Sequence, residues 1–234
     1  MKVCVVTCTG GRPELFALCR KWVERQIRKA DAWVVTTDTG EKPAIPDWAN
    51  FVSVPPLPDT WSHLPCAGAA FALSTALTHV PSGHSVVVME DDDWYSAEHI
   101  RRACIELDRH EIVQLSNLYR WHLPEARYMH GVLGGPTQSL MVPGITSFRS
   151  SAIESVRDAL QYEPFGKLPI HFYDGGTCVS IKGVGYGLPG RAGATRKHLP
   201  HHHKTRKGAL DIGLTRFRSM TFPDGESYVH LLRS

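Results

Sequence analysis

The sequence feature that most constrains the fold is an apolar run that ends in four consecutive acids. The run Val86–Met89 has the length and β-branched content of a buried strand, and Glu90–Asp93 follow it directly. Four adjacent carboxylates repel one another, so this arrangement favours a bound divalent cation, which prefers oxygen ligands. The alternative is a solvated acidic turn that caps the next helix. We favour the cation, because open α/β sheets bind ligands at the C-terminal ends of their strands.

Strand and helix patterns alternate on both sides of this run. Apolar, β-branched stretches predict strands at residues 2–7, 32–37, 85–89 and 112–115. Residues 42–58 read as irregular, with a short strand pattern at 50–54. Helical spacing of apolar residues predicts helices that begin near Pro13, Cys66 and Ser96. This order implies parallel strands joined by right-handed crossovers. The sequence therefore predicts an α/β fold with a mostly parallel, Rossmann-like central sheet flanked by helices.

The second half of the chain is less regular. Ser96 is expected to cap the helix that follows it, and Ser151 with Glu154 forms a capping-box pattern that predicts another helix start. Residues 119–135 are aromatic and show no clear period. The pattern at 227–232 suggests a last short strand, and the five glycines within 183–193 predict a loop.

Length and composition exclude several classes of protein. The 234 residues, 42% of them hydrophobic, suit one large α/β domain with a sizeable core. No stretch approaches the roughly 18 apolar residues of a transmembrane helix, and the N-terminus does not resemble a signal peptide. The six cysteines are scattered singly, without a CxxC pair, as expected for reduced thiols in a cytoplasmic protein.

Positive charge is concentrated near the C-terminus. The net charge is +3, but Arg191–Arg218 contains eight lysines and arginines against one acid, Asp211, a local excess of +7. This excess suggests a polyanionic partner, which is a nucleoside diphosphate, a nucleic acid or both. A solvated basic tail explains the same charges equally well.

Three segments taken together resemble a known family. Val5–Pro13, Val34–Asp38 and Val87–Asp93 are similar, in content and order, to the nucleotide-sugar-binding half of GT-A-fold glycosyltransferases, in particular the family-2-like group. In that group the acids form a DXD-type motif. The resemblance covers roughly the first 110 residues well and the rest loosely. It implies one GT-A-like domain, with residues 1–115 as the nucleotide-sugar half, 116–190 as a smaller acceptor and catalytic half, and 191–234 as a flexible basic lid and tail.

The resemblance also implies site residues. The implied donor-binding residues are Thr7, Thr9, Arg12, Asp38, Asp91, Asp92, Arg196 and Lys197. The implied ligands of Mn²⁺ or Mg²⁺ are Asp91, Asp93 and His198, with His201 or His203 in place of His198 as alternatives. Glu90 and Asp92 are expected only to shape the turn or touch the sugar. The helix at 66–76 lacks the Arg and Asn common in the family, so the basic segment, behind its glycine hinge, is expected to supply the diphosphate contacts.

The catalytic base and the acceptor surface are expected in the second half. Asp174, before Gly175, is the best positional match to the family's general base, and a plain turn aspartate is the alternative. The expected acceptor-binding residues are Trp94, Trp121, His122 and Tyr173, because aromatic rings stack on sugars and bases. The same residues would serve equally well in packing.

The implied function is metal-dependent, inverting transfer of a sugar from a nucleoside-diphosphate sugar, with UDP as the expected nucleotide, to an acceptor hydroxyl. The expected acceptor is a hydroxymethylated base in DNA, as in phage-type DNA modification, or else a glycan or a small molecule. The protein is expected to act in the cytoplasm (of the host cell if phage-encoded), without membrane insertion or an obligate protein partner. Two alternatives stay open: a nucleotidyltransferase with the same type of metal site, and a non-enzymatic nucleic-acid-binding module with a structural cation.

Overall fold

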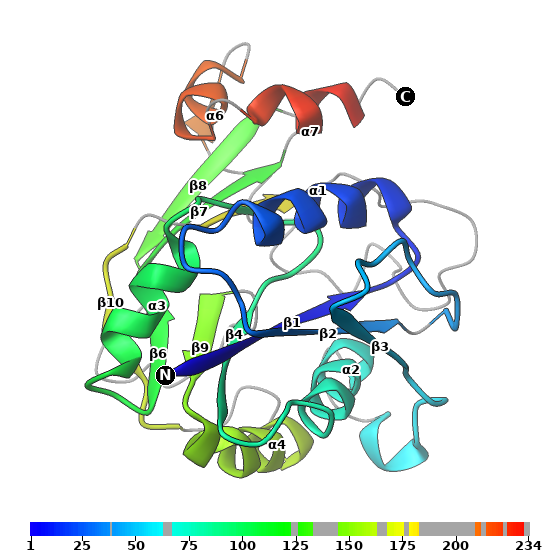
Figure 1. The fold of residues 1–234 in the computed structure, drawn as a ribbon. Helices are drawn as coiled ribbons and strands as arrows, with labels where there is room; N and C mark the ends of the chain where they lie inside the picture. Colours follow the sequence, from blue (N-terminus) through cyan, green and yellow to red (C-terminus); the bar gives the residue numbers. More distant parts are fainter. Residues whose placement is uncertain are drawn as a thin grey trace.

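Two sheets and the helices around them make up the molecule (Figure 1). The computed structural model describes residues 1–37, 39–62, 67–122, 126–132, 145–162, 168–175, 178–182, 209–211, 214–221 and 224–231. All statements about the structure concern these residues.

The larger sheet carries the architecture. Within the described residues its seven strands are, in spatial order, β10 (His171–Tyr173), β6 (Ile112–Leu115), β9 (Thr146–Phe148), β4 (His84–Val88), β1 (Lys2–Thr9), β2 (Ala32–Thr37) and β3 (Ala49–Ser53). Neighbouring strands are parallel except at β9, which pairs antiparallel with both β4 and β6. The central strands are continuous apolar runs because both faces of the sheet are covered. The prediction of a mostly parallel α/β sheet is confirmed.

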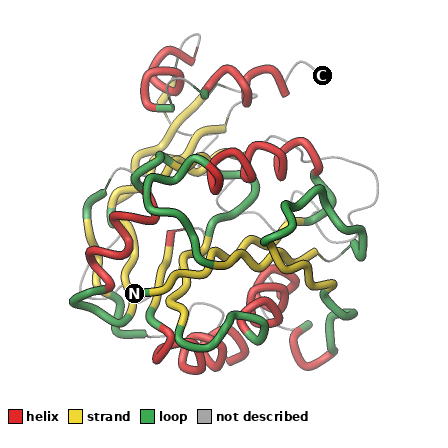
Figure 2. The backbone as a smooth tube through the Cα atoms, in the orientation of Figure 1, coloured by secondary structure: helices red, strands yellow, loops and turns green. Residues whose placement is uncertain are grey.

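Helices cover the two faces of this sheet, as the backbone trace in Figure 2 also shows. Side chains alternate across β1: Val3 and Val5 pack in the core of α1 (Pro13–Glu24) and α3 (His99–Leu107). Their neighbours Cys4 and Val6 pack in the core of α2 (Ala67–Leu77) and α4 (Ile153–Tyr162). The fold is therefore a three-layer α/β arrangement with one core on each face.

A smaller sheet flanks the first. Among the described residues its strands are, in order, β12 (Ala209–Leu210), β8 (Arg127–Val132), β7 (Asn117–His122), β11 (Cys178–Lys182) and β5 (Trp94–Tyr95). The antiparallel pair β7–β8 occupies the stretch in which the sequence shows no period. Two short helices, α6 (Thr215–Met220) and α7 (Gly225–Leu231), lie beyond the N-terminal end of β8 at the top of Figure 1.

The helices predicted after Ser96 and Ser151 are present as α3 and α4, but both predicted caps and the predicted last strand are wrong. Residues 227–231 belong to helix α7 and not to a strand. Helix α3 begins at His99 with Glu98 at its N-cap and no side-chain cap, so Ser96 does not cap it. Helix α4 is preceded by the single turn η4 (Ser150–Ala152), and the Ser151 hydroxyl donates to Glu111 Oε1 at 2.8 Å rather than capping α4. In each case the packed surroundings overrode a local sequence signal.

Two expectations about the chain as a whole can be compared with the described residues. No disulfide joins the cysteines described there, which are Cys4, Cys8, Cys19, Cys104 and Cys178. None of the helices in this part of the chain has the length and apolar character that crossing a bilayer requires.

One further turn, η1 (Asp59–Trp61), lies between β3 and α2 in the sequence.

Candidate active site

Two loops meet where the parallel strands of the larger sheet have their C-terminal ends. Because β1 and β4 are parallel neighbours, the loop after β1, Gly10–Arg12, and the loop after β4, Met89–Asp93, leave the sheet on the same side. The Met89 N–H donates to Val6 O at 3.0 Å, which extends the pairing one residue past β4. Gly11 has a φ of +67°, and a side chain there would come within 2.9 Å of Thr39. The glycine thus allows the first loop to turn back toward the acids.

Arg12 binds two of the four acids. Its guanidinium contacts both oxygens of Asp91, with Nε at 3.2 Å from Oδ2, and Nη1 lies 3.1 Å from Asp92 Oδ2. The Thr9 hydroxyl donates to Asp91 Oδ2 at 2.7 Å. Arg12 and Asp91 are buried, with relative exposures of 8% and 0%. Since a buried charge without a partner is strongly unfavourable, the positive charge of Arg12 explains how the fold tolerates this acid run.

The environment of Asp91 acts on its pKa in two opposing directions. Burial raises the pKa of the Asp91 carboxyl above its ordinary value, and the neighbouring Asp92 raises it further. Arg12 and the Thr9 hydrogen bond oppose that rise by favouring the charged form. Asp91 is therefore held by Arg12 and Thr9, and Arg12 also binds Asp92.

The remaining three acids converge. Glu90, Asp92 and Asp93, hereafter the acid group, each place one carboxylate oxygen within 4.8 Å of the others. Asp92 and Asp93 are buried, and Glu90 is half-buried. Three carboxylates at this spacing form an oxygen-only ligand set, which suits Mg²⁺ or Mn²⁺ better than softer metals. The residues present therefore fit a cation of the expected kind.

Backbone contacts hold the acid group in place. Asp93 Oδ1 accepts a hydrogen bond from the N–H of Ile181, in β11, at 2.9 Å. The N–H of Glu90 donates to the Tyr95 hydroxyl at 2.8 Å, and burial raises the pKa of that phenol. The second sheet thus contributes directly to the position of the acids. No local sequence signal links Ile181 to this loop.

The predicted donor and metal residues take different places. Asp92 and Asp93 belong to the acid group, and Thr9, Arg12 and Asp91 form the ion-pair network beside it. Sequence reasoning did not single out Glu90 as a ligand, although its place in the acid run was the available signal. Thr7 is fully buried in β1 and accepts a hydrogen bond from Trp33 Nε1 at 3.1 Å. The residues Asp38, Arg196, Lys197, His198, His201 and His203 lie outside the described residues.

The predicted acceptor residues are mostly packed in the interior. Trp121 is fully buried, and its Nε1 donates to Asp211 Oδ2 at 3.0 Å. Trp94 is 6% exposed and donates to Asp224 Oδ2 at 3.2 Å. Tyr173 is buried as well, and burial raises the pKa of its phenol. The side chain of His122 lies outside the described part. These contacts give Trp94, Trp121 and Tyr173 a packing role in this conformation.

Asp174 and the acids lie at the same end of the sheet, where its parallel strands have their C-terminal ends. It directly follows β10 and is exposed, and β10 is three strand positions from β4 in the larger sheet. At about 4.8 Å between neighbouring strands, that separation is about 14 Å. A side chain added at Gly175 would come within 2.9 Å of Leu115, so the turn after Asp174 packs tightly against β6. Asp174 and the acid group therefore lie at the same end of the sheet, with β6 and β9 between them.

Comparison with known proteins yields structural similarity only. The chain is similar to S. aureus TarS residues 1–349, at a TM-score of 0.48 and 13% identity over 77% of this chain and 60% of that one. The match to the same TarS fragment in complex with UDP has a TM-score of 0.48, 12% identity and the same coverage. It is also similar to 2-C-methyl-D-erythritol 4-phosphate cytidylyltransferase from Thermus thermophilus, at a TM-score of 0.49 and 14% identity over 75% and 89% of the two chains.

No protein-family model matches the sequence, and neither does any curated protein. The chain spans 60% of the length of the TarS fragment. Similarity at this level concerns the course of the backbone and does not identify a reaction. The functional proposal below therefore rests on side chains.

Proposed function

We propose that this chain is a metal-dependent glycosyltransferase, which moves a sugar from a nucleoside-diphosphate sugar to an acceptor hydroxyl. The observation that carries the proposal is the convergence of Glu90, Asp92 and Asp93 within 4.8 Å, at the edge of a parallel sheet where ligands bind. In this proposal the acid group holds Mn²⁺ or Mg²⁺. A divalent cation held there supplies positive charge against the leaving nucleoside diphosphate.

The protein's own residues have separate tasks in this proposal. Arg12 and Thr9 fix Asp91, and through it the backbone of the acid loop, so that the acid group is preorganised before the donor binds. Ile181 fixes the carboxylate of Asp93 from the other sheet. Arg196 and Lys197, in the basic segment, are proposed to contact the diphosphate.

Asp174 is the proposed general base. Its exposed carboxylate would accept the proton of the acceptor hydroxyl as that oxygen attacks the anomeric carbon, and the diphosphate would leave on the opposite side. The separation of about 14 Å from β4, at about 4.8 Å per strand, leaves room for a sugar and an acceptor between the base and the acid group. This arrangement corresponds to inversion at the anomeric carbon.

The proposal is tested with a panel of nucleoside-diphosphate sugars in Mn²⁺ or Mg²⁺. We expect slow hydrolysis of at least one donor, a rise in melting temperature with its nucleoside diphosphate plus metal, and loss of both in Asp93→Asn. Asp59→Asn, an exposed aspartate in η1, is the matched control and should change neither. A panel without turnover or thermal shift, with and without added acceptors, would refute the proposal.

Nucleotidyl transfer is distinguished by its product, because it releases pyrophosphate from a nucleoside triphosphate. The acceptor is identified by offering glycans, small hydroxylated molecules and hydroxymethylated DNA in parallel. Loss of activity on DNA with added salt would indicate phosphate contacts by the basic segment.

A further inference from the structure

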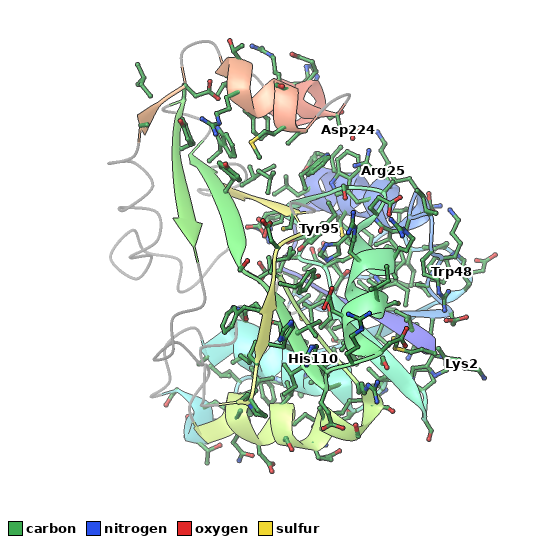
Figure 3. The ribbon with its side chains drawn as sticks, turned by 90° about the vertical axis from the view of Figure 1, so that its left-hand side faces the viewer. Lys2, Arg25, Trp48, Tyr95, His110 and Asp224 are labelled. Carbon is green, nitrogen blue, oxygen red and sulfur yellow. The ribbon has the colours of Figure 1, made fainter. Side chains whose placement is uncertain are left out.

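A second cluster of ligand-type side chains lies away from the acid group, where α3 ends beside the edge strand β10. Glu106 and His110 are one helical turn apart, and the His110 N–H donates to Glu106 O at 3.0 Å, so both side chains lie on one face. His171 opens β10, which pairs with β6 at the end of the sheet. Figure 1 shows α3, β6 and β10 side by side, and Figure 3 views the molecule from that side and labels His110.

The three side chains, hereafter the His–Glu group, approach one another closely. Each places one nitrogen or oxygen within 4.8 Å of the others, and His171 Nε2 lies 3.8 Å from Glu106 Oε2. The rings of His110 and His171 stack with their centroids 3.6 Å apart and an interplanar angle of 7°. The side chains of His171 and Glu106 are 42% and 26% exposed, so an ion can reach them from solvent.

We propose that the His–Glu group binds a transition-metal ion of the Zn²⁺ class. Two imidazoles and one carboxylate form a nitrogen-rich set, which suits Zn²⁺, whereas the acid group offers oxygen only and suits Mg²⁺ or Mn²⁺. A solvent molecule fills the fourth position. The chain thus carries two metal sites of opposite selectivity.

Small side-chain rotations complete the proposed site. Ligand atoms around a tetrahedral Zn²⁺, at about 2.0–2.1 Å from the metal, lie about 3.4 Å from one another. The group therefore closes by up to about 1.4 Å from its present 4.8 Å limit. The face-to-face stack opens as one imidazole turns to point its nitrogen lone pair at the ion. Both imidazole side chains are partly exposed to solvent.

The consequence is a link between the end of α3 and the start of β10. Edge strands of three residues are held by few hydrogen bonds, and β10 pairs with β6 through His171, Phe172 and Tyr173 alone within the described residues. The residue after β10 is Asp174. The ion thus fixes the strand that leads to Asp174. This structural role does not depend on which reaction takes place near Asp174.

The competing explanation is a surface cluster held by ring stacking and the ion pair between His171 and Glu106. An exposed pair at 3.8 Å is worth little and predicts no metal dependence. Metal titration separates the two explanations.

The test titrates Zn²⁺ into the 234-residue chain in which the histidines at 198, 201, 202 and 203 are replaced by glutamine, which removes competing imidazoles of the basic segment. In excess Mg²⁺, which occupies the acid group, we expect one tightly bound Zn²⁺ per chain by calorimetry, a higher melting temperature, and the visible absorption of a four-coordinate ion with Co²⁺. His110→Gln and His171→Gln in this background should each weaken Zn²⁺ binding by about tenfold or more and abolish the Co²⁺ band.

Two matched variants complete the test. His79→Gln removes an exposed histidine distant from the cluster in sequence, and Asp93→Asn removes a carboxylate of the acid group; both should retain Zn²⁺ binding. Absence of Zn²⁺ binding, or equal affinity in His79→Gln and His171→Gln, overturns the proposal. Circular dichroism confirms that each variant is folded, and anomalous scattering at the zinc edge from crystals of the unsubstituted protein provides a test without variants.

Discussion

At the scale of single residues, Arg12 is the side chain on which the acid loop depends most. Replacing it in Arg12→Met leaves Asp91 buried with no adjacent cation, which we expect to lower the free energy of unfolding by about 3–5 kcal/mol. Urea denaturation measures this change. The control is Arg20→Met, which removes an exposed i,i+4 pair with Glu24 and should cost about 0.5 kcal/mol or less.

The double variant Arg12→Met with Asp91→Asn tests the cause. It should be more stable than Arg12→Met alone, because the uncompensated carboxylate has gone. If both single arginine variants lose the same stability, the network around Asp91 is not what holds the loop.

His99 is predicted to make stability depend on pH. It is fully buried against the Tyr95 ring, and burial lowers its pKa from 6.5 to about 3. Between these values the unfolded chain binds a proton that the folded chain does not, so this contribution is fully present above about pH 6.5 and is lost as the pH falls toward 3. From pH 6.5 to 5 we expect a loss of about 2 kcal/mol, at about 1.4 kcal/mol per unit.

His99→Leu is the comparison, since it fills the buried position with an apolar side chain and removes the titrating group. Urea denaturation at pH 7, 6 and 5 should give the variant a shallower decline than the unsubstituted protein. Parallel declines would mean that His99 is not responsible.

At the scale of secondary-structure elements, helix α7 is tied to the strand that follows the acids. Asp224, at its start, pairs with Arg25 and accepts from Trp94 Nε1 at 3.2 Å, while Arg25 Nη2 donates to Tyr95 O at 2.6 Å. These contacts join the end of the chain to α1 and β5. The acid loop is thereby held at both its ends, by β4 before it and by this junction after it.

Asp224→Ala should therefore loosen both α7 and β5. We expect a loss of about 1–3 kcal/mol, because the Trp94 N–H and the Arg25 guanidinium lose a partly buried partner. Hydrogen exchange should become faster in 94–95 and 225–231. Glu226→Ala, which removes a largely exposed carboxylate nearby on the same helix, should leave exchange in 94–95 unchanged. Unaltered exchange in Asp224→Ala would contradict the coupling.

At the scale of the whole molecule, the proposed reaction divides its tasks between distant strands. The acid group follows β4, and Asp174 follows β10 at the end of the sheet. Since they are separated, donor binding and transfer should be separable by substitution. Asp174→Asn is expected to keep donor binding, measured by thermal shift with nucleoside diphosphate and metal, and to lower transfer by about 10²–10⁴-fold.

The matched control for this change is Asp158→Asn, on helix α4, which should transfer at the normal rate. Unchanged transfer in Asp174→Asn would remove it as the base and leave the proposal for the acid group intact. Joint loss of binding and transfer would instead assign Asp174 to the donor site.

The sequence by itself determined the central sheet and the place of the acids. Residues 2–9, 32–37, 84–88 and 112–115 form strands because each is a short, β-branched, apolar run, and α1, α2 and α3 follow from helical spacing. Such patterns are local, so they predict the same strands and helices whichever way these elements pack in an α/β fold. They also place the acid run at a strand end, which is why a metal site could be predicted there.

Only the tertiary structure decided what each acid contacts. The partners of Asp91 are 79 and 82 residues away in the chain, and the amide that holds Asp93 is 88 residues away, so no local pattern could report them. The same holds for the pair β7–β8, for helix α7 and for the meeting of His110 with His171. These features form because distant segments bury charge and apolar surface against one another, and the energy of that burial depends on the packed neighbours rather than on sequence period.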